Sequence, residues 1–598
     1  MSKTAEARDI KTYAVKGGSF LIKDTSASDV FTPEDFTEEQ RMIAQTTYDF
    51  VQGEVVPNIG ELEHKNFDIA VDLLRKAGKL GLLSVDIPEK YSGLGLDKVC
   101  SMLVGENLAL YGSFAVTHGG HTGIGCWPII YFGTEEQKSH YLPKFATGEL
   151  IGAYALTEPH SGSDALAAKT RAVLSEDGKY YILNGTKMWI TNAGFADVFI
   201  TFAKVDGDKF SCFIIEKTFP GVSTGKEEHK MGILGSSTRT LELQDARVPA
   251  ENLLGEIGKG HIIAFNVLNL GRFKLGAAAV GGSKAAIKDS VAYALERHQF
   301  GKPIASFGAI KQKLAEMAIR TYALESMVYR TAGLIDSAVE GVDPDDSHAI
   351  LKGVEEYAIE CSINKVYGSE TLDEVVDEMV QIYGGYGYSE EYPAARAYRD
   401  SRINRIFEGT NEINRMLIPG MLMKRAMKGE LALMPAVQKL MEELLSFPSF
   451  EEEEETVLSE EIKLVRNAKK VALMVAGLAA QKYMQNLTDQ QELLIGMADI
   501  VMEVYAMESM LLRTLKYVGN NGEERGSLRI EATRTFISDG IDKIDIKAKS
   551  MVASITEGDM LRTNLAALKR FTKHTPYNTI QARQKIATAI TEVGRYIF

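Results

Sequence analysis

The chain has 598 residues, which is too long for one domain and predicts roughly three or four. Apolar residues make up 45% and charged residues 25%, the proportions of a globular protein, and no apolar run approaches the length of a membrane-spanning helix. The formal net charge of −14, with no basic patch interleaved with aromatic residues, excludes nucleic acid as a partner.

Cysteine and histidine usage argues against a metal site. The four cysteines are far apart and form no CxxC pair, which indicates a reducing compartment. His118 and His121 lie close together, but no nearby carboxylate completes a ligand set, so a structural role is favoured. The N-terminus lacks the apolar core of a signal peptide and differs from a mitochondrial transit peptide. We expect a cytoplasmic protein of the bacterial type, without a targeting peptide.

The first half of the chain changes from helical to β periodicity. After an N-terminal segment (1–34), apolar residues recur at three- and four-residue steps and predict a helical domain at 35–150. The next segments are short, β-branched and aromatic, and they predict an antiparallel β domain at 151–260. The expected strands are 179–191, 196–205, 209–217 and 238–248, and "SEDGKY" is typical of a hairpin turn.

The second half is helical again. Residues 261–430 predict a helical bundle, 431–459 a linker with the acidic run 451–455, and 460–598 a C-terminal helical extension. The last stretch, 562–598, holds seven Lys and Arg against one acid. It either touches an anionic membrane or packs as a docked helix on the acidic body. The predicted fold class is α+β, mostly α.

Four motifs suit a planar ligand that carries phosphate. "YALTEPHSGSD" gathers hydroxyls and backbone N–H groups, and "KMWITNAG" offers an indole followed by Thr191. "ERHQFGKPI" offers Arg297 as a fork for a pyrophosphate, and the glycines of "QIYGGYGYSEEYP" let a ligand come near. The plain alternatives are a surface turn, a core Trp, an Arg that caps its own helix and a helix-ending turn. The glycine spacing is not that of a Rossmann motif.

"RIFEGTNEINR" (405–415) places Glu408 between an apolar pair and a glycine, just before a helix start. Thr410 or Asn411 is suited to be the N-cap of that helix. Apolar neighbours raise the pKa of a carboxyl from about 4.3 toward roughly 6–7, as in general bases. The alternative is an exposed acid that precedes a helix.

Taken together, "LTEPHSGSD", "WITN", "ERHQFGK", "QIYGGYGY" and "RIFEGTNEI" stand in the order and spacing of one family. Over roughly residues 35–430 the chain resembles the acyl-CoA dehydrogenases. "NLGRFKLGAAAVGG", "FGAIKQKLAEM" and the extension after 430 are similar to the very-long-chain branch. The resemblance implies an N-terminal helical domain, a middle β domain, a C-terminal four-helix bundle and an extra C-terminal helical domain.

By motif, the resemblance implies that Glu408 is the base that removes the α-proton of the substrate. It implies that FAD contacts Leu156, Thr157, Ser163, Trp189, Thr191, Arg297, Phe300, Gln381, Gly385, Thr410 and Asn411, with the Arg297 to Gly385 group often acting across a dimer interface. The acyl-CoA substrate would meet Ser163, Arg272 and Gly409. The chain departs from the family pattern at His160–Ser161, at Gly308 and over its first 30 residues.

The implied function is the FAD-dependent α,β-dehydrogenation of long-chain acyl-CoA thioesters to trans-2-enoyl-CoA in fatty-acid β-oxidation. An electron-transferring flavoprotein accepts the electrons, the protein is a homodimer, and weak peripheral membrane contact through the extension is a further expectation. The small residues of 108–125 either open a deep slot for the acyl chain or serve close helix packing. The rival functions are an acyl-CoA oxidase that uses oxygen and a flavoprotein assembly scaffold.

Overall fold

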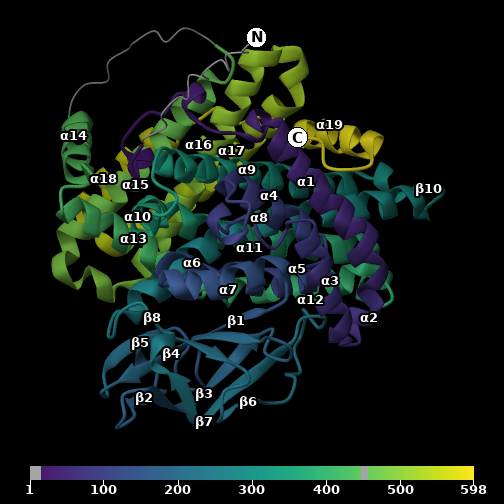
Figure 1. The fold of residues 1–598 in the computed structure, drawn as a ribbon. Coiled ribbons are helices and arrows are strands. Elements are labelled where there is room, and N and C mark those ends of the chain that lie inside the picture. The colour runs from purple at the N-terminus through teal and green to yellow at the C-terminus, as the bar shows by residue number, and fades with distance from the viewer. Residues whose placement is uncertain (1–14, 446–455) are drawn as a thin grey trace, which may run out of the picture.

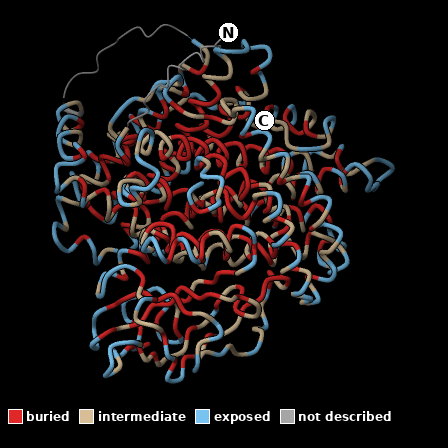
Figure 2. The backbone as a smooth tube through the Cα atoms, in the orientation of Figure 1, coloured by how far each residue is buried: buried red, intermediate tan, exposed pale blue. Residues whose placement is uncertain are grey.

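The structure, a computed structural model, describes residues 15–445 and 456–598. Helices form the upper part of the molecule and one sheet lies below them (Figure 1). The acidic run 451–455 lies outside the described residues. Buried backbone is concentrated where the helices meet and along the strands that face them (Figure 2).

The N-terminal helical domain follows short 3₁₀ turns that begin at Ser19. Its first long helix starts at a capping box in which Thr37 and Gln40 satisfy each other's backbone N–H groups. A second capping box, made by Thr134 and Gln137, starts its last helix. The helices are α1 Glu38–Phe50, α2 Ile59–Glu63, α3 Phe67–Lys79, α4 Lys98–Leu108, α5 Gly112–Gly119, α6 Trp127–Phe132 and α7 Glu135–Thr147.

The middle domain is one sheet with the strand order β6-β7-β3-β2-β4-β5-β8. The four expected strands form, and β2 and β3 make the expected hairpin. The sheet is mixed rather than purely antiparallel, because β4 pairs in parallel with both β1 and β2. The strands are β1 Gly152–Ala155, β2 Arg171–Leu174, β3 Tyr180–Thr191, β4 Val198–Val205, β5 Lys209–Glu216, β6 Val222–Thr224, β7 Thr238–Pro249 and β8 Leu253–Leu254.

The helical bundle follows the sheet, and its two long central helices, α8 and α11, approach closely. A Cβ added to Gly368 of α11 would lie 3.3 Å from the Cα of Gly276 of α8, so glycine permits this approach. The helices are α8 Gly260–Glu296, α9 Gly308–Val339, α10 Ser347–Glu356, α11 Ala358–Tyr383, α12 Pro393–Ser401 and α13 Asn411–Met427. A small hairpin, β9 His298–Gln299 and β10 Lys302–Pro303, projects between α8 and α9.

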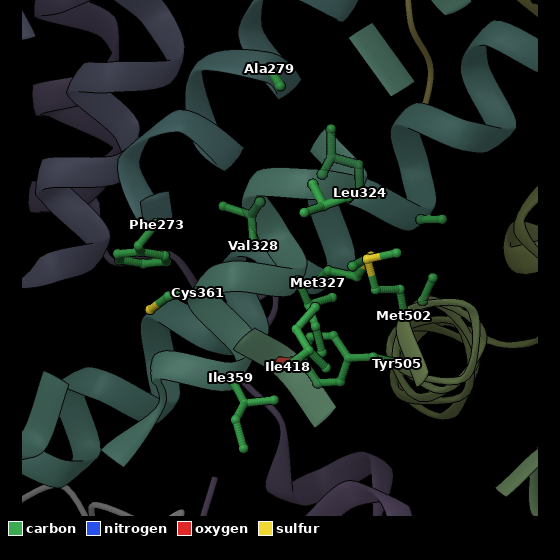
Figure 3. Close-up of a cluster of buried hydrophobic side chains, with 14 of the residues drawn as sticks. Phe273, Ala279, Leu324, Met327, Val328, Ile359, Cys361, Ile418, Met502 and Tyr505 are labelled. Atoms are coloured by element: carbon green, nitrogen blue, oxygen red, sulfur yellow. The ribbon is translucent and has the colours of Figure 1, made fainter. Parts of the chain in front are cut away.

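The C-terminal extension shares the core of the bundle. Met502 and Tyr505 of α16 lie beside Met327 of α9 and Ile418 of α13 (Figure 3). The expected linker at 431–459 contains a helix, α14, which packs on α15 through Val437 and Gly477. The helices are α14 Leu433–Leu445, α15 Ser459–Tyr483, α16 Gln491–Asn521, α17 Glu523–Ile555, α18 Gly558–Thr572 and α19 Thr579–Val593.

The basic C-terminal tail is docked on the body. Arg583 pairs with Glu316 and Asp539, and the Tyr596 hydroxyl donates to Glu325 at 2.9 Å. The Phe598 ring packs 4.7 Å from that of Tyr322. Of the two readings of the tail, the structure therefore shows the docked helix. None of the described helices has the length and hydropathy needed to cross a membrane.

Candidate active site

Glu408 lies in a loop, residues 406–410, that we call the base loop. Thr410 is the N-cap of α13, since its hydroxyl accepts from the Ile413 N–H at 3.3 Å. Glu408 itself has a left-handed backbone with φ 58°, and its Oε2 atom is shielded from solvent without a hydrogen-bond partner among the described residues. Burial raises the pKa of the Glu408 carboxyl to about 7, although Arg272 and Lys365 oppose the shift.

Helix α8 provides the surface on which this carboxylate rests. A Cβ added to Gly271 would lie only 2.6 Å from Glu408 Oε2, so the glycine makes room for the acid. The next residue, Arg272, is buried and donates from Nε to the Glu408 carbonyl oxygen at 3.2 Å. The "LGR" turn of α8 therefore positions the base from one side.

Two residues that hold the Glu408 loop from the other side were not predicted from the sequence. Lys365 of α11 is fully buried and donates to the Gly409 carbonyl oxygen at 2.7 Å. Asn414 of α13 is also buried and donates to the carbonyl oxygens of Gly409 and Thr410 at 2.8 and 3.0 Å. The sequence held two features that could have indicated these contacts. They are a lysine within the apolar stretch "CSINKVYG" and a glycine in the middle of α8.

The motifs "YALTEPHSGSD" and "KMWITNAG" meet where the loop after β1 lies against β3. The Thr157 carbonyl oxygen accepts from the Met188 N–H at 2.8 Å, which ties the loop that follows β1 to β3. Trp189 has φ 62° and is 55% exposed, so its indole lies open on the surface and not in the core. Thr191 ends β3 and faces the turn that follows α5, since a Cβ on Gly120 would lie 3.0 Å from its methyl group. Leu156 is part of the same loop as Thr157, and Ser163 lies exposed further along it.

A second group of predicted residues lies at the far end of α8. Arg297 and Gly385 line an open cavity of about 650 Å³, and the Arg297 guanidinium lies over the Tyr386 ring. Phe300 is 93% exposed on the projecting hairpin, and Gln381 is exposed near the end of α11. Arg297 is roughly 37 Å from Arg272 along the helix axis, at about 1.5 Å per residue. One chain therefore does not bring this group to the base.

Asn411 faces the protein interior. It is 2% exposed, and its amide donates to Ser369 Oγ and Glu370 Oε1, both at 3.0 Å. Its carbonyl oxygen accepts from Lys365 Nζ at 2.7 Å. These bonds occupy both ends of the side chain, so the structure gives Asn411 a role in holding the base loop.

The small residues of 108–125 line a cavity in one part of the segment and pack closely in another. Residues 109–112, 115 and 116 line a cavity of about 120 Å³, together with Gly282 of α8 and Leu372 of α11. Gly125, in contrast, packs closely, because an added Cβ would lie 2.6 Å from the Gly120 carbonyl oxygen. The first half of the segment lines this cavity. In the second half, the same Cβ on Gly125 would lie 2.9 Å from the backbone of Gly152, so glycine lets the turn after α5 approach β1.

The two neighbouring histidines have structural contacts. His118 Nε2 bonds to the Leu82 carbonyl oxygen, and His121 bonds through Nε2 to the Phe145 carbonyl oxygen and through Nδ1 to the Gly152 N–H, each at 3.0 Å. Burial lowers the pKa of His118 to about 3 and that of His121 to about 4, so both are neutral. Among the described residues no group of His, Cys, Asp or Glu could hold a metal ion.

The arrangement fits FAD. An exposed indole beside Thr191 suits the flavin ring, and the open cavity at Arg297 and Gly385 suits the nucleotide end. Glu408 Oε2 and the Tyr154 hydroxyl are shielded polar atoms without partners among the described residues.

Sequence profiles of the acyl-CoA dehydrogenase domains match most of the chain. The N-terminal domain matches residues 37–149 and the middle domain 153–246. Two profiles described as the acyl-CoA dehydrogenase C-terminal domain match residues 258–422 and 467–570, the second of them in the extension.

Individual proteins that are similar to the chain carry the same family name as these profiles. The chain is 55% identical to a probable acyl-CoA dehydrogenase of Bacillus subtilis, over 97% of this chain and 98% of that protein. The crystal structure of an acyl-CoA dehydrogenase complexed with FAD from Bacillus anthracis is 55% identical, with a TM-score of 0.96 over 98% of this chain and 100% of that one. The very long-chain specific acyl-CoA dehydrogenase of Rattus norvegicus is 41% identical over 58% of this chain and 52% of that protein. The chain belongs to the acyl-CoA dehydrogenase family, and it is an enzyme with FAD as its cofactor.

Proposed function

We propose that the protein dehydrogenates long-chain acyl-CoA thioesters at the α and β carbons to trans-2-enoyl-CoA, as a step of fatty-acid β-oxidation, with Glu408 as the base. The observation that carries this proposal is the Glu408 Oε2 atom, which is shielded and has no hydrogen-bond partner in the part of the chain that the structure describes, in a carboxyl group whose pKa is near neutrality. A base with a pKa near the working pH is ionised often enough to accept a proton and basic enough to remove it.

The backbone of the base loop supports a second role in the same step. The carbonyl oxygens of Glu408, Gly409 and Thr410 are all occupied by donors from the surrounding helices. Within the described residues the Glu408 N–H has no acceptor. It can therefore donate to the thioester oxygen as negative charge develops there, which makes it one half of an oxyanion hole. Gly409, with φ 79° and no side chain, leaves space for the acyl chain beside it.

We assign the flavin end of FAD to Leu156, Thr157, Ser163, Trp189, Thr191 and Thr410, and the nucleotide end to Arg297, Phe300, Gln381 and Gly385. When bound, FAD supplies the two-electron acceptor that takes the β-hydrogen as hydride. Ser163 and Arg272 would also contact the acyl-CoA. The proposed electron acceptor of the enzyme is an electron-transferring flavoprotein.

The proposal of a long acyl chain rests on the cavity between α5, α8 and α11. Small apolar residues make up part of its wall, among them Ala109, Gly112, Ala115, Ala278 and Gly282, whereas Asp289 and, from α12, Arg396 and Asp400 make the remaining wall polar. Ala278 and Gly282 lie on α8 beyond Gly271 and Arg272, about two and three helical turns further along from the base, which is the direction that a long chain would need.

The separation of the two ends of the FAD site supports a homodimer. Arg297 and Gly385 lie far from Glu408 in one chain, and the projecting Phe300 is almost fully exposed. An exposed aromatic residue on a projecting arm is typical of a contact with another copy. We propose that a second copy covers this face and completes the FAD site.

Weak peripheral membrane contact through the extension stays a prediction. Helix α18 exposes Met560 and Arg562 on its outer surface while the tail that follows it is docked. Sedimentation of the protein with anionic vesicles, but not with neutral ones, is the expected result. If the same fraction of the protein stays in the supernatant with anionic and with neutral vesicles, the prediction of membrane contact is wrong.

Purification followed by anaerobic titration tests the main proposal. We expect a yellow protein whose flavin absorbance bleaches with acyl-CoAs of long chain length faster than with butyryl-CoA. In air, without an added acceptor protein, peroxide formation should be slow. Rapid peroxide formation would instead show that the protein is an acyl-CoA oxidase. Co-purification of partner proteins in stoichiometric amounts, with negligible turnover, would show that it is an assembly scaffold.

A further inference from the structure

We propose that the C-terminal extension positions the base loop through a hydrogen-bonded relay, Asp499–Arg415–Glu370–Asn411–Lys365, in which Lys365 is the positioning residue next to Glu408. This inference rests on the proposed role of Glu408. It assigns the extension a function in catalysis in addition to its packing.

The relay is needed because the base loop has an unfavourable backbone. Glu408 and Gly409 are consecutive residues with left-handed φ values of 58° and 79°. A non-glycine residue in this conformation is strained and persists only where its surroundings hold it. The surroundings here are donors to the loop carbonyls, namely Arg272, Lys365 and Asn414.

Lys365 is the donor that joins the loop to the rest of the relay. Its ammonium group donates to the Gly409 carbonyl oxygen and to Asn411 Oδ1, both at 2.7 Å, and the residue is fully buried. Asn411 then donates from Nδ2 to Glu370 Oε1 at 3.0 Å. Lys365 and Asn411 form the buried end of the relay, and Glu370 is partly exposed. Buried hydrogen bonds whose members all have partners fix geometry more tightly than the separate bonds do.

Arg415 carries the relay from the bundle to the extension. It binds Glu370 with two parallel hydrogen bonds, from Nη1 at 2.6 Å and from Nη2 at 2.8 Å. Its Nε donates to Asp499 Oδ1 of α16 at 2.8 Å. Asp499 is held in turn by Lys547 of α17 at 2.9 Å. A bidentate Arg–carboxylate pair fixes the relative orientation of its two side chains. A displacement of Asp499 on α16 would therefore shift Arg415 and Glu370, and with them the N-terminus of α13 and the loop before it.

The charged groups around Glu408 determine how a change in the relay would alter the pH at which Glu408 ionises. The groups that face Glu408 are Arg272 from α8, Lys365 from α11 and Tyr154 from β1. The groups that face Lys365 are Glu408, Arg272, Glu412 and Glu370. Burial lowers the pKa of Lys365 itself to about 7, so this lysine carries its charge mainly below neutral pH. There, removing it takes away one of the two cations that favour ionised Glu408, so the pH at which the base ionises should rise.

The experiment compares Arg415→Met with Arg583→Met in the FAD-loaded enzyme. Both arginines join the extension to the bundle through partly buried ion pairs, with 15% and 11% of the side chain exposed, but Arg583 has no contact with the relay. Hydrogen exchange of the peptide that spans 402–415 should accelerate roughly 10-fold or more in Arg415→Met and stay unchanged in Arg583→Met. Equal exchange in both variants would overturn the relay whether or not the enzyme is active.

Activity gives the second readout. Flavin bleaching by palmitoyl-CoA should slow roughly 10-fold or more in Lys365→Met, with its pH midpoint moved upward, because a misplaced base costs up to about 10²-fold. Asp499→Asn, at the far end, should slow bleaching less and leave the pH midpoint in place. An unchanged rate and midpoint in Lys365→Met would contradict the positioning role. A wild-type enzyme that no acyl-CoA bleaches would refute the proposed function instead, while the exchange measurement still decides the relay.

Discussion

Glu408 owes its chemistry to its immediate neighbours. Burial favours the neutral carboxyl, and the cations Arg272 and Lys365 keep the pKa from rising beyond about 7. Gly271 leaves the space that the carboxylate occupies. From "RIFEGTNEINR" the N-cap of α13 could be narrowed to Thr410 or Asn411, and the structure shows Thr410. The space that Gly271 leaves for Glu408 could not be predicted, because it depends on the register between α8 and the base loop.

The pH dependence of flavin bleaching follows from the raised pKa. Below pH about 7 most Glu408 is protonated and cannot accept the α-proton, so the rate should rise with pH through about 7 and then level off. Stopped-flow measurement of bleaching between roughly pH 5.5 and 8.5 checks this. A rate that is flat across this range would contradict the assignment.

Gly271→Ala should impair the enzyme without unfolding it. The new Cβ would meet Glu408 Oε2 at 2.6 Å, so the carboxylate must move, and a displaced base costs up to about 10²-fold in rate. FAD content should stay normal. Gly420→Ala is the matched control, since a Cβ there has nothing within 4 Å and it also lies within a helix. If both variants bleach at the wild-type rate, Gly271 has no part in positioning the base.

At the scale of elements, the strands and long helices could be predicted from local periodicity and from the turn residues between them, although β4, β5 and much of α9 are buried on more than one face. The parallel pairings of β4 with β1 and β2 were missed, since strand order depends on contacts between distant segments. Helix α14 was not predicted, because the acidic run 451–455 in the same segment is typical of a solvated linker. The relay was missed for a similar reason, because it joins α11, α13 and α16, which no local motif connects.

The hairpin of β9 and β10 is the element on which the dimer proposal can be tested. Phe300 is 93% exposed there, so Phe300→Ser should leave the folded chain intact and weaken association of the two copies. We expect more monomer in sedimentation velocity and faster loss of FAD on dilution. Met434→Ser, an exposed apolar residue on α14, is the control that should change neither. A wild-type protein that is monomeric yet retains FAD would rule the dimer out.

At the scale of the whole molecule, a buried ion network joins its parts. Arg513 of α16 pairs with Glu325 of α9 at 2.7 Å and with Glu34 of the N-terminal segment at 2.9 Å. Glu325 also binds Lys284 of α8 at 2.5 Å, which in turn binds Glu106 of α4 at 2.6 Å. These pairs connect the N-terminal domain, the bundle and the extension, so we expect the three to unfold together.

Glu325→Gln tests this connection. Burial alone would raise the pKa of Glu325, but Lys284 and Arg513 outweigh it and lower the pKa to about 2. Its contribution to stability is therefore present above its unfolded pKa of about 4.3 and is lost as pH falls toward about 2. Removing one partner of a buried pair costs roughly 3–5 kcal/mol.

We therefore expect the thermal midpoint of Glu325→Gln to lie well below that of the wild type at neutral pH, and the difference to shrink in acid. Asp206→Asn, which removes an exposed partner of Lys209, should leave the midpoint unchanged. A difference between wild type and Glu325→Gln that stays constant from neutral pH into acid would contradict the ion-pair account.

The most direct test of the account is anaerobic bleaching of the FAD-loaded Glu408→Gln variant by palmitoyl-CoA, beside the wild type. Glutamine keeps the shape of the side chain but cannot accept the α-proton. We predict normal FAD content and a bleaching rate lower by at least ~10²–10⁴-fold. Bleaching at close to the wild-type rate would show that another group removes the proton and would contradict the proposed role of Glu408.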